Sequence, residues 1–114
     1  MKYLLQIYSD RAFDTYETLS AEEREAITAE YFALLEAPGV VGSGHLQPTA
    51  TATTVQVRNG ETLLTDGPFV DAKEHLGGYY LVEGDNLDAA LDVAARIPAA
   101  RMGGAIEVRP LVDR

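Results

Sequence analysis

Four ionisable side chains that could carry acid–base chemistry lie within one five-residue segment of the chain. Residues 71–75 read Asp-Ala-Lys-Glu-His, so Lys73, Glu74 and His75 closely follow Asp71. General acid–base catalysis needs titrating groups within hydrogen-bond reach, and histidine is the side chain that titrates near neutral pH. A solvated loop has the same composition, and an ion pair between Lys73 and a carboxylate would hold such a loop in place. From the residues alone, both interpretations stay open.

A second candidate is Asp66, which stands directly before Gly67-Pro68-Phe69. A carboxylate held by turn amides stays ionised and fixed in direction, so Asp66 could bind a ligand or take a proton. The same four residues also suit a tight turn without a chemical role, in which Gly67 takes a positive φ and Phe69 enters the core. We therefore treat Asp66 as a candidate catalytic residue that could also cap a turn.

His45, Tyr79 and Tyr80 are the remaining candidates, and all three fall in segments expected to be strands. His45 could line a cavity as a catalytic base, although a single histidine on a strand is more often an ordinary hydrogen-bonded polar residue. Side chains alternate between the two faces of a strand. One of the two tyrosines should therefore enter the core, and the other could offer its hydroxyl to a ligand.

Composition excludes several kinds of site and partner. With no cysteine and only two histidines, one subunit cannot form a thiolate or an all-histidine metal centre. A mixed site with Asp66 or Asp71 has no diagnostic spacing and no Gly-rich phosphate loop occurs, so we expect neither a metal nor a cofactor. The net charge of −9 disfavours nucleic acid. Without a long apolar run or a signal-peptide pattern, we expect a cytoplasmic protein that does not contact membranes.

Alternating and apolar runs predict the strands that must position these residues. We expect strands at residues 2–8, 40–46, 53–58, 61–65, 76–83 and 105–109. Asn59-Gly60 lies between the third and fourth of them and is typical of a type I′ hairpin turn. Gly42 and Gly44 make a bulge in the second strand plausible.

Two helices are expected, and residues 10–18 are expected to form a polar loop. Ser20 and Glu23 make a capping-box pattern that begins the first helix. Its apolar stripe consists of Ile27, Tyr31, Leu34 and Leu35. Asp85 or Asn86 should cap the second helix. Its apolar face would carry Leu87, Leu91, Ala94 and Ala95.

The order of these elements predicts an α+β fold. Without the hairpin it is βαββαβ, the ferredoxin-like plan, in a single domain over residues 1–114. Both helices then cover one face of the sheet. The other face would carry Leu4, Tyr8 and one of the paired tyrosines, and a monomer rarely leaves a large apolar face exposed. A second copy is the natural cover, so we expect a homodimer.

The longest distinctive block runs from Thr65 to Tyr80, Thr-Asp-Gly-Pro-Phe-Val-Asp-Ala-Lys-Glu-His-Leu-Gly-Gly-Tyr-Tyr. This block resembles the signature of the DGPF branch of the YCII-related family. Residues 46–48 (Leu-Gln-Pro), 94–98 (Ala-Ala-Arg-Ile-Pro) and 107–110 (Glu-Val-Arg-Pro) agree with it as well. The resemblance covers nearly the whole chain and ranks Lys73 and Glu74 ahead of His75 as ligand-binding residues.

The resemblance implies a dimeric α+β barrel, in which two ferredoxin-like subunits join their sheets around a central cavity. Members are small bacterial proteins, and those of the DGPF branch are often encoded beside, or fused to, extracytoplasmic-function sigma factors. Relatives nearer the YciI type pair a histidine on the first helix with an aspartate before a later proline. In this chain the residue before Pro98 is Ile97, and the first predicted helix has no histidine, so that dyad does not carry over.

The resulting hypothesis is a small-molecule protein whose inter-subunit cavity binds, and could transform, a small organic acid, lactone or phenolic compound. This hypothesis rests on analogy with enzymes that have the same barrel fold. The alternative is a non-enzymatic accessory protein associated with a sigma-factor regulon. Convergence of Asp66, His45, Lys73 and a tyrosine hydroxyl on one apolar pocket would favour the enzyme. Among these groups we expect Asp66 to affect binding more than either histidine.

Overall fold

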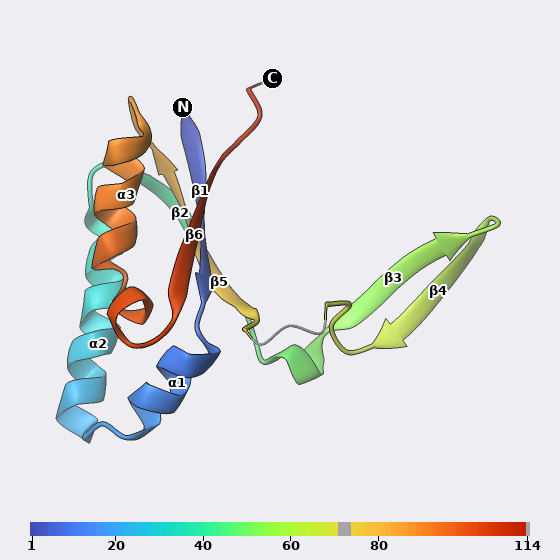
Figure 1. Cartoon of the computed structure of the whole chain (residues 1–114), viewed down its shortest axis with the longest axis horizontal. Helices are drawn as coiled ribbons and strands as arrows, with labels where there is room; N and C mark the ends of the chain where they lie inside the picture. Colours follow the sequence, from blue (N-terminus) through green and yellow to red (C-terminus); the bar gives the residue numbers. More distant parts are fainter. Residues whose placement is uncertain (71–73, 114) are drawn as a thin grey trace.

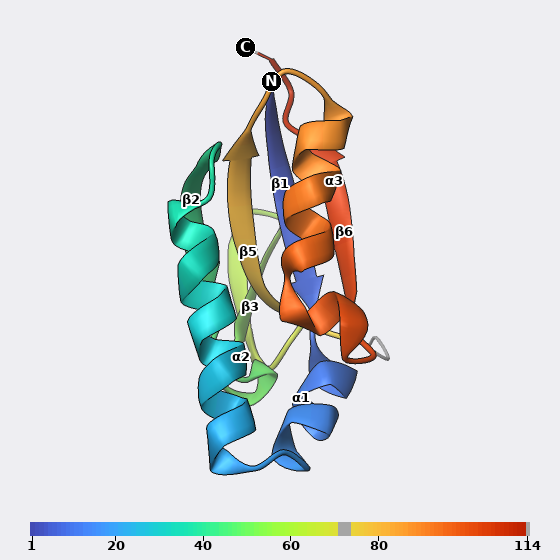
Figure 2. The same ribbon diagram turned by 90° about the vertical axis from the view of Figure 1, so that its left-hand side faces the viewer.

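A four-stranded antiparallel sheet in the order β2-β5-β1-β6 forms the centre of the computed structural model, which describes residues 1–70 and 74–113. Its strands are β1 (Lys2–Tyr8), β2 (Val40–His45), β5 (Leu76–Glu83) and β6 (Ala105–Pro110). The helices α2 (Ala21–Ala33) and α3 (Leu87–Arg96) both cover one face of this sheet, as Figures 1 and 2 show. The predicted ferredoxin-like α+β fold with an inserted hairpin is therefore confirmed.

The core lies between the sheet and the helices. On the central strand β1, alternation buries Tyr3, Leu5 and Ile7 against the helices and leaves the intervening side chains on the other face. Tyr80 and Val82 of β5 lie on the helix side, because they stand opposite Leu5 and Tyr3 in the antiparallel ladder. From α3 the core receives small residues, Ala90, Val93 and Ala94.

The inserted hairpin consists of β3 (Thr53–Arg58) and β4 (Glu61–Asp66), which pair only with each other in a separate two-stranded sheet. Asn59 and Gly60 have φ angles of 50° and 78°, so the predicted type I′ turn is confirmed. Gly67, at the base of the hairpin, also has a positive φ, and its amide donates to the Ala52 carbonyl at 2.8 Å. Figure 1 shows the hairpin projecting well away from the four-stranded sheet.

The predicted helix starts and the predicted bulge are also present. The Ser20 side chain accepts from the Glu23 amide at 3.1 Å, and the Glu23 carboxylate accepts from the Ser20 amide at the same distance, which lowers the pKa of Glu23. Asn86, rather than Asp85, caps α3 by accepting from the Ala89 amide. The register of β2 against β5 shifts between Val40 and Gly42, as a bulge requires.

Three local predictions were wrong. Residues 10–17 form a helix, α1 (Asp10–Glu17), whose Ala12 is buried. The apolar face predicted for α3 is displaced, because Leu87 and Leu91 are exposed and small side chains face the sheet instead. Phe69 does not enter the core of its own chain, since its side chain is 72% exposed.

The remaining segments are the short 3₁₀ helices η1 (Leu34–Glu36), η2 (Thr49–Thr51) and η3 (Pro98–Arg101). In the part of the chain described, no helix has the length and apolar character needed to cross a bilayer.

Candidate functional site

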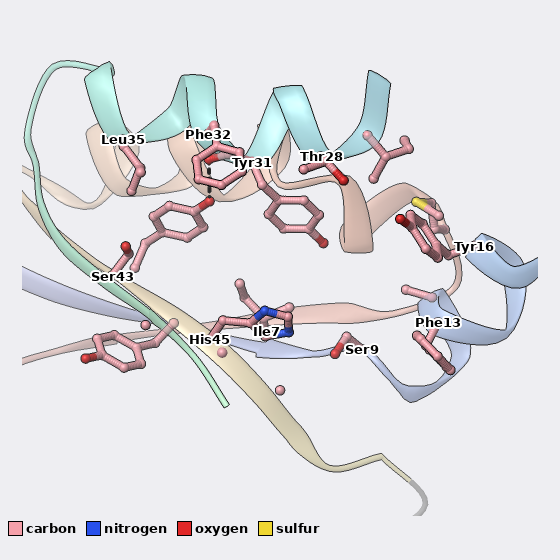
Figure 3. Close-up of a pocket in the computed structure, with 18 residues that line it drawn as sticks. Ile7, Ser9, Phe13, Tyr16, Thr28, Tyr31, Phe32, Leu35, Ser43 and His45 are labelled. Atoms are coloured by element: carbon pink, nitrogen blue, oxygen red, sulfur yellow. Dashed lines mark hydrogen bonds between the residues drawn. The ribbon is translucent and has the colours of Figure 1, made fainter. Parts of the chain in front are cut away.

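A cavity of about 430 Å³ separates α2 from the sheet, on the side of the sheet that carries the helices. Its presence explains why α2, although it carries the predicted apolar stripe, has no fully buried side chain over its 13 residues. Ile27, Tyr31 and Leu35 of that stripe line the cavity instead of filling a core. Figure 3 shows Tyr31 and Leu35 facing the sheet across this space. The volume lies in the range typical of small-molecule pockets.

The lining is rich in aromatic rings, and it carries no formal charge unless His45 is protonated. The rings that face the cavity belong to Phe13, Tyr16, Tyr31, Phe32 and Tyr80. The polar side chains of the lining are Ser9, Thr28, Ser43, His45 and the tyrosine hydroxyls, and no Asp, Glu, Lys or Arg lines the cavity within residues 1–70 and 74–113. Such a surface suits a planar ligand that is neutral or singly charged.

Two tyrosines tie α2 to β5 and to η3 beside the cavity. The Tyr80 hydroxyl donates to the Tyr31 carbonyl at 2.8 Å, and the Tyr31 hydroxyl accepts from the Ala99 amide at 3.2 Å. Burial raises the pKa of Tyr80 to about 12, and the nearby Tyr31 adds to this shift. Burial also raises the pKa of Tyr31, against the opposing effect of the Ala99 amide. Both hydroxyls therefore keep their protons at neutral pH, and the Tyr31 proton remains free to be donated to a ligand.

His45 is the titratable imidazole in the cavity. It stands at the end of β2 opposite Gly78, so its side chain shares the helix side of the sheet with Ser43 and Tyr80. In Figure 3 the imidazole lies on the sheet floor, below Tyr31 and between Ser43 and Ser9. No hydrogen bond from the described residues engages its ring nitrogens, so both are available to a ligand. Among the neutral donors and acceptors of the lining, this imidazole is the group suited to act as a general acid or base.

The helix α1 closes one end of the cavity. Ala12, Phe13 and Tyr16 line this end, and Figure 3 places Phe13 and Tyr16 at the opposite end from Leu35. The rings of Phe13 and Tyr16 stack with their centroids 6.5 Å apart. Arg24 of α2 lies over the Tyr16 ring at 5.2 Å and donates to the Tyr16 carbonyl, which ties the two helices together.

Two residues of the Thr65–Tyr80 block, Glu74 and His75, hold the beginning of α1. The Glu74 carboxylate accepts from the Arg11 amide at 3.3 Å and contacts the Arg11 guanidinium at the same distance. His75 places its amide 3.0 Å and its Nδ1 2.9 Å from one oxygen of Asp10. A carboxylate on the first amides of a helix satisfies donors that the helix itself cannot. We name this set of contacts, between Asp10–Arg11 and Glu74–His75, the α1 latch.

The structure brings together only some of the residues expected to form a site. His45, Tyr79 and Tyr80 line the cavity, although the Tyr79 ring lies on the opposite face of the sheet, against Gly44. Glu74 belongs to the α1 latch, and Asp66 lies exposed at the end of β4, opposite Thr53. Lys73, like Asp71, falls outside the described residues. The described residues hold no group of three potential metal ligands.

The comparison with protein families agrees with this architecture. A model of the YCII-related domain matches residues 1–113. The chain belongs to the YCII-related family. An uncharacterised protein of Rhizobium meliloti (strain 1021) is 36% identical to it over 116 residues, which cover 97% of this chain and 92% of that protein.

Among solved structures, the YCII-related chain is similar to 5-chloro-2-hydroxyhydroquinone dehydrochlorinase from Burkholderia phenoliruptrix AC1100, in complex with 2,5-dihydroxybenzoquinone. The two share 16% identity and a TM-score of 0.51, over 98% of this chain and 94% of that one. At this identity the likeness shows a common fold.

Two parts of the site were missed by sequence reasoning. Tyr31 was expected only as part of a core stripe, and the ring-bearing end of α1 was expected to be a loop. For Tyr31 the signal was weak, because a tyrosine at helical spacing looks the same above a core and above a cavity. For α1 there was a signal, since Ala12, Phe13 and Tyr16 are spaced to share one face of a helix.

Proposed function

We propose that this YCII-related chain binds a compact phenolic or quinone-type compound in the cavity under α2, and that His45 exchanges a proton with it. The observation that carries the proposal is the lining itself: aromatic rings on several sides, with His45 as the titratable imidazole. A single planar ring can stack on such walls, and its hydroxyl or carbonyl oxygens can meet the few polar groups.

The chemistry available is acid–base. His45 in its neutral form can accept a proton from a ligand hydroxyl and, once protonated, return it to another oxygen or carbon of the same ligand. Tyr31 supplies a hydroxyl donor that stays protonated at neutral pH, because burial raises its pKa. Such a donor stabilises negative charge that develops on a ligand oxygen. No metal or cofactor enters the proposal.

The family and the structural likeness support a small-molecule role at the level of analogy. The dehydrochlorinase of similar fold was solved with a dihydroxybenzoquinone, a compound of the class proposed here. Membership of the DGPF branch, inferred from the Thr65–Tyr80 block, is part of the proposal, as is a single domain spanning the chain. The alternative of an accessory protein in a sigma-factor regulon has no support from these relatives, and we do not favour it.

The experiment is a binding titration with 2,5-dihydroxybenzoquinone, benzoate and a small lactone as probes. We expect the quinone to bind best, and His45→Gln to weaken its binding at least roughly tenfold, about 1.4 kcal/mol. Tyr31→Phe should weaken it by a smaller factor. Tyr79→Phe is the matched control, because the Tyr79 ring packs on the other face against Gly44.

The variant Asp66→Asn distinguishes ligand binding in this cavity from ligand binding in the inter-subunit cavity expected from the sequence. Asp66 lies exposed on the hairpin and does not line the cavity under α2, so its substitution should leave quinone binding unchanged. Unaltered binding by His45→Gln together with a large loss for Asp66→Asn would contradict our assignment. The ligand would then have to be sought in a cavity shared between subunits, where the role of Asp66 stays a prediction.

A further inference from the structure

The polar groups of the cavity under α2 lie mainly near its middle. In Figure 3 the imidazole of His45 and the ring of Tyr31 face each other across this middle region. Ser9 on the floor and Thr28 on α2 come next along the cavity, in the direction of Tyr16. A ring whose oxygens meet these polar groups therefore leaves the part of the cavity beside α1 unoccupied.

This part, which we call the α1 end, is formed by five side chains from α1, α2 and the turn after η3: Ala12, Phe13, Tyr16, Ile27 and Met102. Ile27 and Met102 belong to it because both also line a neighbouring groove together with Thr15 of α1. Apart from the Tyr16 hydroxyl, the five side chains are apolar. No charged carboxylate, lysine or arginine among residues 1–70 and 74–113 lines the cavity here or elsewhere.

Contacts outside the cavity hold the α1 end in shape. The Thr15 hydroxyl donates to the Met102 carbonyl at 3.0 Å, which ties α1 to the turn after η3. Arg24 of α2 donates to the Tyr16 carbonyl at 3.1 Å, and the α1 latch holds the first turn of α1. A site whose walls are held before the ligand arrives loses less conformational freedom on binding. The α1 end is therefore a preformed part of the cavity.

The cavity is larger than a single ring requires. At about 430 Å³ it falls among pockets of roughly 300–1,000 Å³, which enclose drug-sized ligands. A single ring with four oxygens, such as 2,5-dihydroxybenzoquinone, is much smaller than such a ligand. It cannot lie against His45 and also fill the α1 end. Apolar walls without a neighbour lose dispersion contacts, and a water molecule finds few hydrogen-bond partners beside them.

We propose that the α1 end receives an apolar extension of the ligand, a second fused ring or a short alkyl chain attached to the oxygen-bearing ring. This inference rests on the function proposed above, because it places that ring beside His45. It adds the part of the site that selects among phenolic and quinone-type compounds. Phe13 and Ile27 contact the extension and are thus specificity-determining residues, while His45 and Tyr31 meet the ring oxygens.

The same end should reject an extension that carries a charge. A charged group enclosed by Ala12, Ile27 and Met102 would lose its water without gaining a counter-ion from the described lining. The net charge of −9 also repels an anion at long range, but salt screens this second effect. A comparison at high salt therefore reports on the lining itself.

The test uses three probes that share one ring: 2,5-dihydroxybenzoquinone, its 3-butyl derivative and its 3-(3-carboxypropyl) derivative. Their dissociation constants are measured by calorimetric titration at about 0.5 M NaCl. We expect the butyl probe to bind wild type at least roughly tenfold more tightly than the unsubstituted quinone, about 1.4 kcal/mol. The carboxypropyl probe should bind no more tightly than the unsubstituted quinone.

Phe13→Ala and Phe32→Ala are a matched pair of variants at the two ends of the cavity. Their rings are 58% and 65% exposed, so neither substitution removes a core residue, and circular dichroism verifies the fold. Figure 3 shows Phe32 on the side of Tyr31 that faces Leu35, away from α1. Phe13→Ala should reduce the advantage of the butyl probe at least roughly threefold. Phe32→Ala should affect both probes equally and leave the ratio of their dissociation constants near the wild-type value.

Two more variants complete the set. Ile27→Phe fills the α1 end from α2 and should abolish the advantage of the butyl probe. Phe69→Ala should change neither dissociation constant, because Phe69 is 72% exposed and does not line the cavity.

The outcomes separate this inference from the proposed function. If the quinone binds and depends on His45 but the butyl chain adds nothing, the proposed function stands and the inference is wrong. An advantage lost in Phe32→Ala and kept in Phe13→Ala would place the extension at the other end and overturn it too. Tighter binding of the carboxypropyl probe would contradict the apolar character. Binding of none of the probes would refute the proposed function, and the inference with it.

Discussion

Replacing Tyr80 with phenylalanine tests the link between α2 and the sheet that bounds the cavity. The Tyr80 side chain is 5% exposed, and its hydroxyl donates to the Tyr31 carbonyl at 2.8 Å near the end of α2. Removing the hydroxyl deletes this part-buried bond, and the Tyr31 carbonyl loses a donor. A net intramolecular hydrogen bond contributes about 1 kcal/mol, and an orphaned acceptor adds to the loss. We expect Tyr80→Phe to lower the free energy of unfolding by about 1–2 kcal/mol at pH 7.

The pH dependence provides a sharper signature. Burial raises the pKa of Tyr80 to about 12 in the folded protein, above the value near 10 of an unfolded tyrosine. The raised pKa means that the folded state favours the protonated hydroxyl. Its contribution to stability is therefore fully present below about pH 10, and it is lost as pH rises from there through 12. The advantage of wild type over Tyr80→Phe should shrink across this window.

Urea unfolding at several pH values between 7 and 11 measures this difference, and Tyr79→Phe is the control. Tyr79 is the neighbouring tyrosine on the other face of β5, 36% exposed, and makes no side-chain hydrogen bond within the described residues. We expect Tyr79→Phe to unfold within about 0.5 kcal/mol of wild type at every pH. A wild-type advantage that stays constant up to pH 11, or an equal loss in the two variants, would refute the reasoning.

Two further predictions concern the turn between β3 and β4 and the α1 latch. Gly60→Val should cost about 1–2 kcal/mol because Gly60 has a φ of 78°, whereas Asn59→Asp should be tolerated; equal urea midpoints for Gly60→Val and wild type would contradict the turn. Asp10→Asn should lower stability by about 1 kcal/mol, because Asp10 accepts from His75 at the start of α1, while Asp14→Asn on the same helix should be neutral. Hydrogen exchange of the α1 amides would show whether Asp10→Asn loosens that helix, and unchanged exchange would argue against the latch.

Most of the fold was predictable because its signals are local and agree with one another. The alternation over β1, the Asn59-Gly60 turn and the Ser20–Glu23 capping box each specify one element without reference to the rest of the chain. Their order leaves few ways to assemble a sheet with right-handed connections, and the ferredoxin-like arrangement is one of them. The strand order β2-β5-β1-β6 follows from that topology.

The failures have a common physical cause, which is that partners distant in sequence decided the outcome. The eight residues of α1 are too few for an isolated helix in water, so propensity gives little signal there. Glu74 and His75, more than 60 positions away, hold its first turn. In α3 the close approach to the sheet selects alanines for the buried face and displaces Leu87 and Leu91 to its margins, a choice that depends on the distance between layers.

The candidate site was harder to predict than the fold, because it is defined by a space and not by a motif. The sequence block specific enough to indicate a family includes Glu74 and His75, and in the structure these two residues contact α1. Phe13 and Tyr16 of α1 in turn line the cavity, so the block acts on the cavity through the helix it positions. Residues that are distinctive in sequence can therefore act on the cavity indirectly, through a helix that they hold in place. His45 and Tyr31, which face the cavity directly, stand in ordinary strand and helix patterns, and only the packing of α2 over β2 brings them together.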